Sequence, residues 1–224
     1  TLRMATMGRE LDRPATAAET ARMRELLDAC LQQGAIGMSS GLFYPPAMAA
    51  TTDEVASVAE PLGRWGGVYT AHMRDEGETI LDAMDETFEI GRRANARVVV
   101  SHHKCSGKAV HGRTRETLPK FDAIRQKQDV SFDVYPYVAG STILRKEMID
   151  RASKVLVTWS DTVKDVAGRD LAEIAAEWGV SVYDAADRLM PAGAIYFMMD
   201  EDDVRRAMSH PAAMIGSDGL PFDT

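Results

Sequence analysis

Apolar segments recur along this chain at a spacing that strongly limits the fold. Segments with strand-like composition begin near residues 36, 68, 98 and 130, at steps of about 30 residues, the length of one βα unit. Apolar residues with a helical period fill the intervals between them. No sequence repeat accompanies the spacing. We therefore predict successive βα units, arranged as a (β/α) barrel or as a doubly wound parallel sheet.

Signals for the individual elements support this alternation. Thr16 with Glu19, and Thr51 with Glu54, match the capping box that begins a helix. The first of these helices is expected to end at Gly34. Further helices are predicted over about 78–94 and around 118–124, and a buried strand over 35–42. Residues 1–15 show no clear period and are predicted to form a loop.

The alternation stops after residue 137. We interpret 139–193 as a small inserted subdomain, with a short strand at 154–159 and helices at 170–178 and 181–189. An apolar segment at 194–199 and a helix at 202–208 precede the last strand, 213–217. The predicted organisation is thus barrel βα units in 1–138, the insert in 139–193 and the last strand region in 194–224. About five barrel strands are counted, where a closed barrel needs eight, so we expect the chain to be cut at both ends.

Two of the predicted strands end in histidine. His72 ends the strand that begins near 68, and His102 ends the next one, so the two lie one βα step apart. Asp218 follows the last strand. The carboxyl ends of parallel strands meet at one rim of a barrel, and zinc prefers imidazole and carboxylate ligands. The sequence therefore predicts a metal site at this rim, with further ligands supplied by strands that this chain lacks or by a modified or additional group.

The neighbours of His102 receive separate predictions. Side chains alternate along a strand, so Val98, Val100 and His102 are expected on one face and His103 on the other. His103 is accordingly predicted to be structural. Lys104 and Tyr135 end or follow strands at the same rim, where an anionic substrate would arrive. A solvated lysine and a core tyrosine remain alternatives for these two residues.

Composition excludes several classes of partner. The net charge of -8 and the isoelectric point near 5.2 argue against nucleic acid and anionic membrane as partners. No apolar run approaches the roughly 18–20 residues needed to span a bilayer. The two cysteines do not resemble a disulfide framework, and no secretory signal is present. We predict a cytoplasmic protein and leave its oligomeric state open.

Five motifs, in order along the chain, resemble the N-acyl-D-amino-acid deacylases, or D-aminoacylases, of the amidohydrolase superfamily. They are Gly-Ala-Ile-Gly-Met-Ser-Ser-Gly-Leu at 34–42, Ala-His-Met-Arg-Asp-Glu at 71–76, Ser-His-His-Lys at 101–104, Asp-Val-Tyr-Pro-Tyr at 133–137 with Ala-Gly-Ser-Thr at 139–142, and Ile-Gly-Ser-Asp-Gly at 215–219. The resemblance implies the C-terminal portion, about strands 4–8, of the (β/α)8 TIM-like barrel of a metal-dependent hydrolase, with a small inserted subdomain.

The resemblance also implies the chemistry. The family hydrolyses the amide bond of N-acyl-D-amino acids, a small-molecule substrate, and releases a carboxylate and a D-amino acid with the help of one or two Zn²⁺. It implies His72 and His102 as zinc ligands and Asp218 as general base and acid. Residues implied to contact the substrate are Lys104, Tyr135 and Ser141.

Departures from the family pattern leave alternatives open. The family's His-x-His pair and its cysteine ligand would precede Thr1, and a substrate-binding arginine would follow Thr224. Cys30 and Cys105 do not match the position of the cysteine ligand. The alternatives are another amidohydrolase, such as a D-dipeptidase or a cyclic-amide hydrolase, and an inactive fragment that lacks the N-terminal metal ligands.

Overall fold

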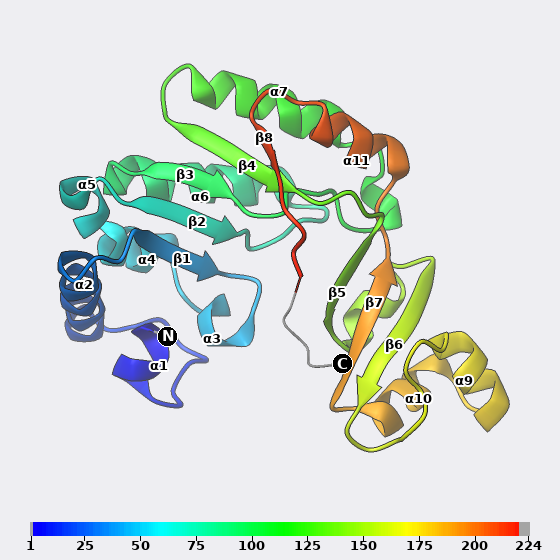
Figure 1. Ribbon diagram of the computed structural model, residues 1–224. Helices are drawn as coiled ribbons and strands as arrows, with labels where there is room; N and C mark the ends of the chain where they lie inside the picture. Colours follow the sequence, from blue (N-terminus) through cyan, green and yellow to red (C-terminus); the bar gives the residue numbers. More distant parts are fainter. Residues whose placement is uncertain (1, 220–224) are drawn as a thin grey trace. The chain divides into compact units, whose positions relative to one another are not determined.

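The computed structural model of the protein describes residues 2–219, which divide into two compact units (Figure 1). The first contains the residues up to Lys104, Thr114–Tyr135 and those from Arg206 onward. The second contains Cys105–Arg113 and Pro136–Arg205. The sequence-based boundaries 1–138, 139–193 and 194–224 stay a prediction, and 220–224 lie outside the described residues.

The first unit is built on a parallel sheet of five strands. In sheet order these are β1 (Gly37–Gly41), β2 (Val68–His72), β3 (Arg97–Val100), β4 (Val130–Val134) and β8 (Ala213–Ile215). Each neighbouring pair is parallel. The first four strands are therefore sheet neighbours in chain order, as the spacing of about 30 residues for a βα unit predicts.

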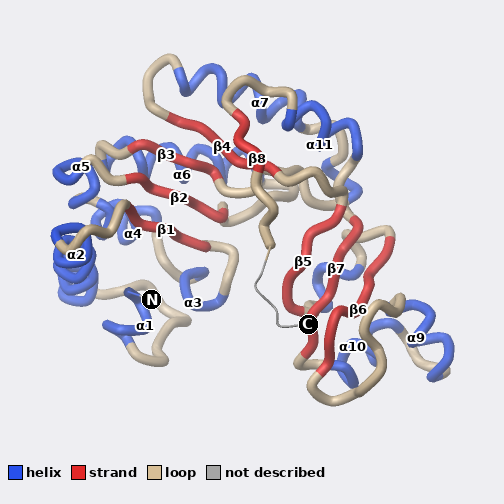
Figure 2. The backbone as a smooth tube through the Cα atoms, viewed as in Figure 1, coloured by secondary structure: helices blue, strands red, loops and turns tan. Residues whose placement is uncertain are grey.

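Helices cover this sheet in one connected layer (Figure 2). The helices of the unit before β4 are α1 (Leu2–Met7), α2 (Ala17–Gln32), α3 (Pro45–Met48), α4 (Thr52–Ala59), α5 (Pro61–Trp65), α6 (Ile80–Ala94) and α7 (Thr114–Arg125). Helix α2 packs on α4, α4 on α6 and α6 on α7, while α6 contacts β3 and α7 contacts β4. Gly91 permits the close approach of α6 to β3, because a Cβ there would lie 2.1 Å from Cγ2 of Val98.

One predicted capping box is complete and the other is not. Thr16 and Glu19 form both hydrogen bonds of the box at the start of α2. At α4, Thr51 accepts from the amide of Glu54, but the Glu54 carboxylate pairs with buried Arg3. Arg3 belongs to α1, so the prediction of a loop over residues 1–15 is wrong for Leu2–Met7.

The strand predicted over 35–42 is shorter and less buried than expected. It forms β1, Gly37–Gly41, whose residues are mostly half-buried, and Ile36 just before it is 86% exposed. Among the described residues β1 is an edge strand that pairs with β2. The apolar composition of 35–42 therefore overstated its burial.

The second unit contains an antiparallel sheet. Its strands are β5 (Ala139–Ile143), β7 (Ala192–Phe197) and β6 (Lys154–Ser160), in that order. Its helices are α8 (Lys146–Ile149), α9 (Leu171–Trp178), α10 (Val182–Leu189) and the 3₁₀ helix Lys108–Val110. Strand β5 was not predicted, because Ala-Gly-Ser-Thr-Ile lacks the apolar run of the other strands. Helix α11 (Glu201–Met208) precedes β8.

No helix within the described part of the chain has both the length and the apolar character needed to cross a membrane.

Candidate metal centre

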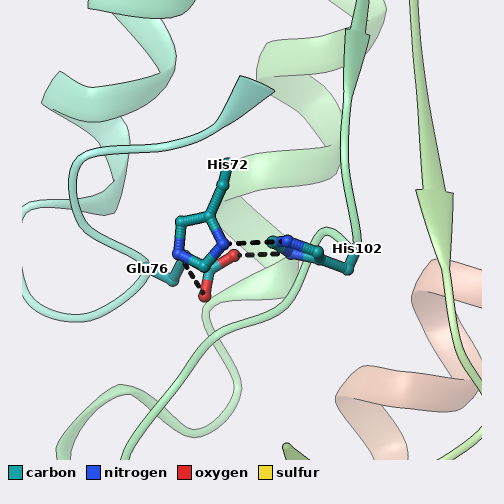
Figure 3. A group of neighbouring side chains, drawn as sticks. All are labelled: His72, Glu76 and His102. Carbon is teal, nitrogen blue, oxygen red and sulfur yellow. Dashed lines mark hydrogen bonds and ion pairs between the residues drawn. The ribbon is translucent and has the colours of Figure 1, made fainter. Parts of the chain in front are cut away.

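Two histidines and a glutamate meet at the carboxyl ends of β2 and β3 (Figure 3). His72 is the last residue of β2, and His102 lies two residues beyond the end of β3. The parallel register pairs Ala71 with Val100, which brings the ends of the two strands together. Glu76 lies in the loop between β2 and α6.

The ring nitrogens are arranged in two sets. Nδ1 of His72 lies 2.9 Å from Nε2 of His102, so these two nitrogens face each other. The other two face Glu76: Nδ1 of His102 is 3.1 Å from Oε1, and Nε2 of His72 is 4.0 Å from Oε2. The three side chains are 16%, 11% and 9% exposed for His72, His102 and Glu76. The site is therefore nearly closed to solvent and has nitrogen and carboxylate donors.

His102 owes its position to a turn. Its φ is +42°, in the left-handed region that non-glycine residues rarely adopt. Its amide donates to Oδ1 of Asp133, at 2.7 Å, and Asp133 belongs to the neighbouring strand β4. The Asp133 carboxylate thus braces the turn and offsets part of the cost of this conformation.

The predicted alternation of faces is wrong beyond Val100. Strand β3 ends there, and the turn places His103 on the face that α7 covers. The His103 ring lies against Phe121 of α7 and Phe132 of β4, and Nε2 is 2.9 Å from Oγ1 of Thr117. His103 is therefore part of the core, between β4 and the helix α7 that packs on it.

Lys104 adds a positive charge to the cluster. Its Nζ lies 2.7 Å from Oε2 of Glu76 and 2.8 Å from Nδ1 of His102. The ammonium also lies 5.5 Å from the centroid of the Tyr135 ring, in the range of a cation–π contact. Lys104 is nearly buried, so the alternative of a solvated lysine is wrong. Tyr135 is buried as well, and burial raises the pKa of its hydroxyl.

Burial and the neighbouring charges set the ionisation of the site. Burial lowers the pKa of His72 to about 4, so its imidazole is neutral at pH 7, the form that binds a metal. For Glu76, burial acts to raise the pKa, but the Lys104 charge and the hydrogen bond to His102 outweigh it and hold the pKa well below its usual range. Glu76 is therefore a carboxylate paired with an ammonium.

The other predicted site residues lie elsewhere in the fold. Asp218 follows β8 by three residues, is exposed and has a φ of +50°. Its charge acts on the hydroxyl of Tyr135 and contributes to the rise in that pKa. Ser141 lies on β5 in the second unit, where it is exposed.

Sequence reasoning missed Glu76, Phe43 and Tyr44. Glu76 follows His72 by four residues, but no fixed period applies in a loop, so this spacing gave no signal. The rings of Tyr44 and Phe43 lie 4.8 and 5.5 Å from that of His72. Phe43 and Tyr44 follow the end of β1, and His72 ends the neighbouring strand β2. Their position just beyond the end of a predicted strand was the sequence signal that could have identified them.

The donor set fits a zinc ion. Two nitrogens bound to one tetrahedral zinc at the usual bond lengths lie roughly 3.3 Å apart, and the facing nitrogens of His72 and His102 are 2.9 Å apart. A small rotation of either ring provides the difference. Among the described residues, His72, Glu76 and His102 form the group that could hold a metal ion, because their three potential ligand atoms lie within 4.8 Å of one another. Fold and site together define an α/β protein of parallel βα units with a candidate metal centre at the strand ends.

Comparisons with known proteins agree with this description. The chain is 53% identical over 223 residues to a D-aminoacylase of Alcaligenes xylosoxydans xylosoxydans, and 43% identical over 223 residues to an N-acyl-D-glutamate deacylase of the same organism. The matches cover 100% and 99% of this chain and 46% of each relative. The chain thus spans about half the length of the curated relatives it matches. No family model matches the chain.

Solved structures give the same result. A D-aminoacylase crystal structure matches 99% of this chain with a TM-score of 0.93 and 54% identity, over 46% of its own length. An N-acyl-D-glutamate deacylase from Bordetella bronchiseptica, in complex with zinc and a phosphonate mimic of the tetrahedral intermediate, matches 97% with a TM-score of 0.93 and 42% identity, over 46% of its length.

The resemblance to the N-acyl-D-amino-acid deacylases, a family of amidohydrolases, is confirmed over the whole of this chain. The predicted fold class, a C-terminal portion of the metal-dependent hydrolase barrel, is confirmed by the same structural matches.

Proposed function

We propose that the protein to which this chain belongs hydrolyses the amide bond of N-acyl-D-amino acids with the help of zinc. The observation that carries the proposal is the pair of facing nitrogens on His72 and His102, 2.9 Å apart at adjacent strand ends. Relatives of the chain are a D-aminoacylase, an N-acyl-D-aspartate deacylase and an N-acyl-D-glutamate deacylase. The substrate is accordingly a small molecule.

Each predicted residue has a role in this scheme. His72 and His102 would hold zinc, which when bound would supply a Lewis acid for the amide carbonyl and lower the pKa of a bound water. Asp218 accepts the proton of the attacking water and returns it to the amine, which would otherwise leave poorly. The products are a carboxylate and a free D-amino acid.

Three further residues bind the substrate. Lys104 and Tyr135 meet its carboxylate: an ammonium is a strong partner for that group, and the nearly closed site strengthens the attraction. Ser141 is a third substrate contact.

The number of zinc ions, one or two, and the cytoplasmic location stay predictions.

The test uses the full-length protein, stripped of metal by a chelator. We expect it to lose hydrolysis of N-acetyl-D-methionine and to regain it when zinc is added. N-acetyl-L-methionine is the matched control and should react far more slowly. Activity that is indifferent to the chelator would contradict the proposal.

Another amidohydrolase activity is the second candidate. A D-dipeptidase or a cyclic-amide hydrolase would use the same histidines and aspartate. Comparing N-acyl-D-amino acids with D-dipeptides and hydantoins decides between them, since the preferred substrate has the highest kcat/KM. For the 224 residues alone we expect little bound zinc and no activity, because two imidazoles are too few ligands for a zinc site.

A further inference from the structure

The carboxylate of Glu76 contacts every charged or ligating group of the candidate metal centre. Its oxygens lie 3.1 Å from Nδ1 of His102, 4.0 Å from Nε2 of His72 and 2.7 Å from Nζ of Lys104. The side chain is 9% exposed. A carboxylate this deeply buried needs hydrogen-bonding partners to be stable, and His102 and Lys104 provide them, whereas Nε2 of His72 lies beyond hydrogen-bond distance.

The geometry determines which nitrogen of His102 is available to a metal. Nε2 faces His72, whereas Nδ1 lies beside both Oε1 of Glu76 and, at 2.8 Å, Nζ of Lys104. When Nε2 gives its lone pair to a metal, the proton of the neutral ring is on Nδ1. An ammonium cannot accept that proton, so Glu76 is the acceptor beside it. Lys104 pairs with both oxygens of Glu76, at 2.8 Å from Oε1 and 2.7 Å from Oε2.

We propose that Glu76 is a positioning residue of this centre: it accepts the Nδ1–H of His102, directs Nε2 toward the metal, and neutralises Lys104 beside it. The proposal rests on zinc binding by His72 and His102 as proposed above. Carboxylates that hold a ligating histidine in this way typically change metal affinity by about 10- to 100-fold when removed.

Two explanations of such an effect must be separated. Loss of Glu76 removes the acceptor for His102, but it also leaves the Lys104 charge unbalanced, and that charge repels a cation. A pair of variants separates them. Lys104→Met keeps the carboxylate and removes the ammonium. The double variant, Glu76→Leu with Lys104→Met, removes both groups, so that neither position carries a buried charge.

The experiment measures the zinc Kd of full-length protein by competition with a chromophoric chelator, after circular dichroism shows that each metal-free variant is folded. We expect Lys104→Met to bind zinc at least as tightly as the wild type, and the double variant to bind about 10- to 100-fold more weakly than Lys104→Met. Glu78→Gln is the control, because Glu78 is exposed two residues further along the same loop. It should leave the Kd unchanged.

Equal zinc affinities of Lys104→Met and the double variant would overturn this inference while leaving the proposed function intact. A full-length wild type that takes up no zinc would overturn the proposed function, and this inference with it. A purely structural Glu76 would lower the urea midpoint of the metal-free protein and leave the Kd of the folded variants equal.

Discussion

Arg74 and Glu86 form a two-point ion pair that joins the loop after β2 to α6. Nε and one terminal nitrogen of Arg74 each lie 2.8 Å from a carboxylate oxygen of Glu86. The same guanidinium donates to the carbonyls of Met48 and Ala50, both at 2.8 Å. Arg74 therefore holds the segment that follows Tyr44, whose ring lies against His72.

Arg74→Met should destabilise the protein by about 1–3 kcal/mol, because Glu86 and two carbonyls lose a charged donor and Glu86 is only 12% exposed. Urea unfolding measures the change. Arg92→Met is a matched control: Arg92 makes the same two-point contact with Glu89, at 2.7 Å for both bonds, but on the surface. That change should cost less than about 1 kcal/mol. Equal losses in the two variants would contradict this account of Arg74.

Glu19 should make stability depend on pH. Hydrogen bonds from Arg13 and from the Thr16 backbone lower its pKa to about 2, from an ordinary value of 4.5. Because the folded pKa lies below the unfolded one, the stabilisation is complete above pH 4.5 and is lost as the pH falls toward 2.

The difference in urea midpoint between wild type and Glu19→Gln should accordingly shrink between pH 5 and pH 2, a range set by these two pKa values. Arg13→Gln removes the principal hydrogen-bond partner of Glu19. This variant should therefore also show a smaller loss of stability between pH 5 and pH 2 than the wild type. A midpoint difference that grows on acidification would show that the sign of the effect is wrong.

Asp133→Ala should disturb the centre without touching a ligand. It removes the acceptor for the His102 amide, so we expect a loss of about 1–3 kcal/mol in stability and of about tenfold in zinc affinity of the full-length protein. Asp133→Asn retains an oxygen acceptor and should lose less of both. Urea unfolding and chelator competition provide the two measurements. An Asn variant as weak as the Ala variant would rule out this hydrogen bond as the cause.

Asp218→Asn tests the proposed general base and acid. We expect kcat of the full-length protein to fall by about 10²- to 10⁴-fold, because the amide cannot accept the proton of water. Zinc content should stay at the wild-type level, since Asp218 is exposed and is not among the cluster of His72, Glu76 and His102. Asp161→Asn, at an exposed position, is the control and should retain full activity. Retention of activity by Asp218→Asn would remove this residue from the mechanism.

Much of the first unit could be predicted from sequence because its information is local. The apolar runs that became β2, β3 and β4 and the capping box at Thr16 are each encoded within a few residues. The pairing of His72 with His102 followed from the length of a βα unit. Their roles as metal ligands remain a proposal.

The parts that were missed depend on contacts distant in sequence. Glu54 leaves its capping box for Arg3, 51 residues away, and no local rule foresees that choice. Strand alternation failed at His102 because the chain turns there, and the group that stabilises the turn, Asp133, is 31 residues further on. Glu76 joins the site from a loop, where neither a helical nor a strand period applies.

The bond from the His102 amide to Asp133 also defines how small a piece of this protein can keep the cluster of His72, Glu76 and His102 in place. A graft of β2 and β3 alone would bring both imidazoles and Glu76 but not the carboxylate that holds the His102 turn. The smallest unit that keeps this cluster together is therefore three strands with their two connections, residues 68–134. A designer who moves the two histidines to another barrel must bring an acidic residue on the third strand with them.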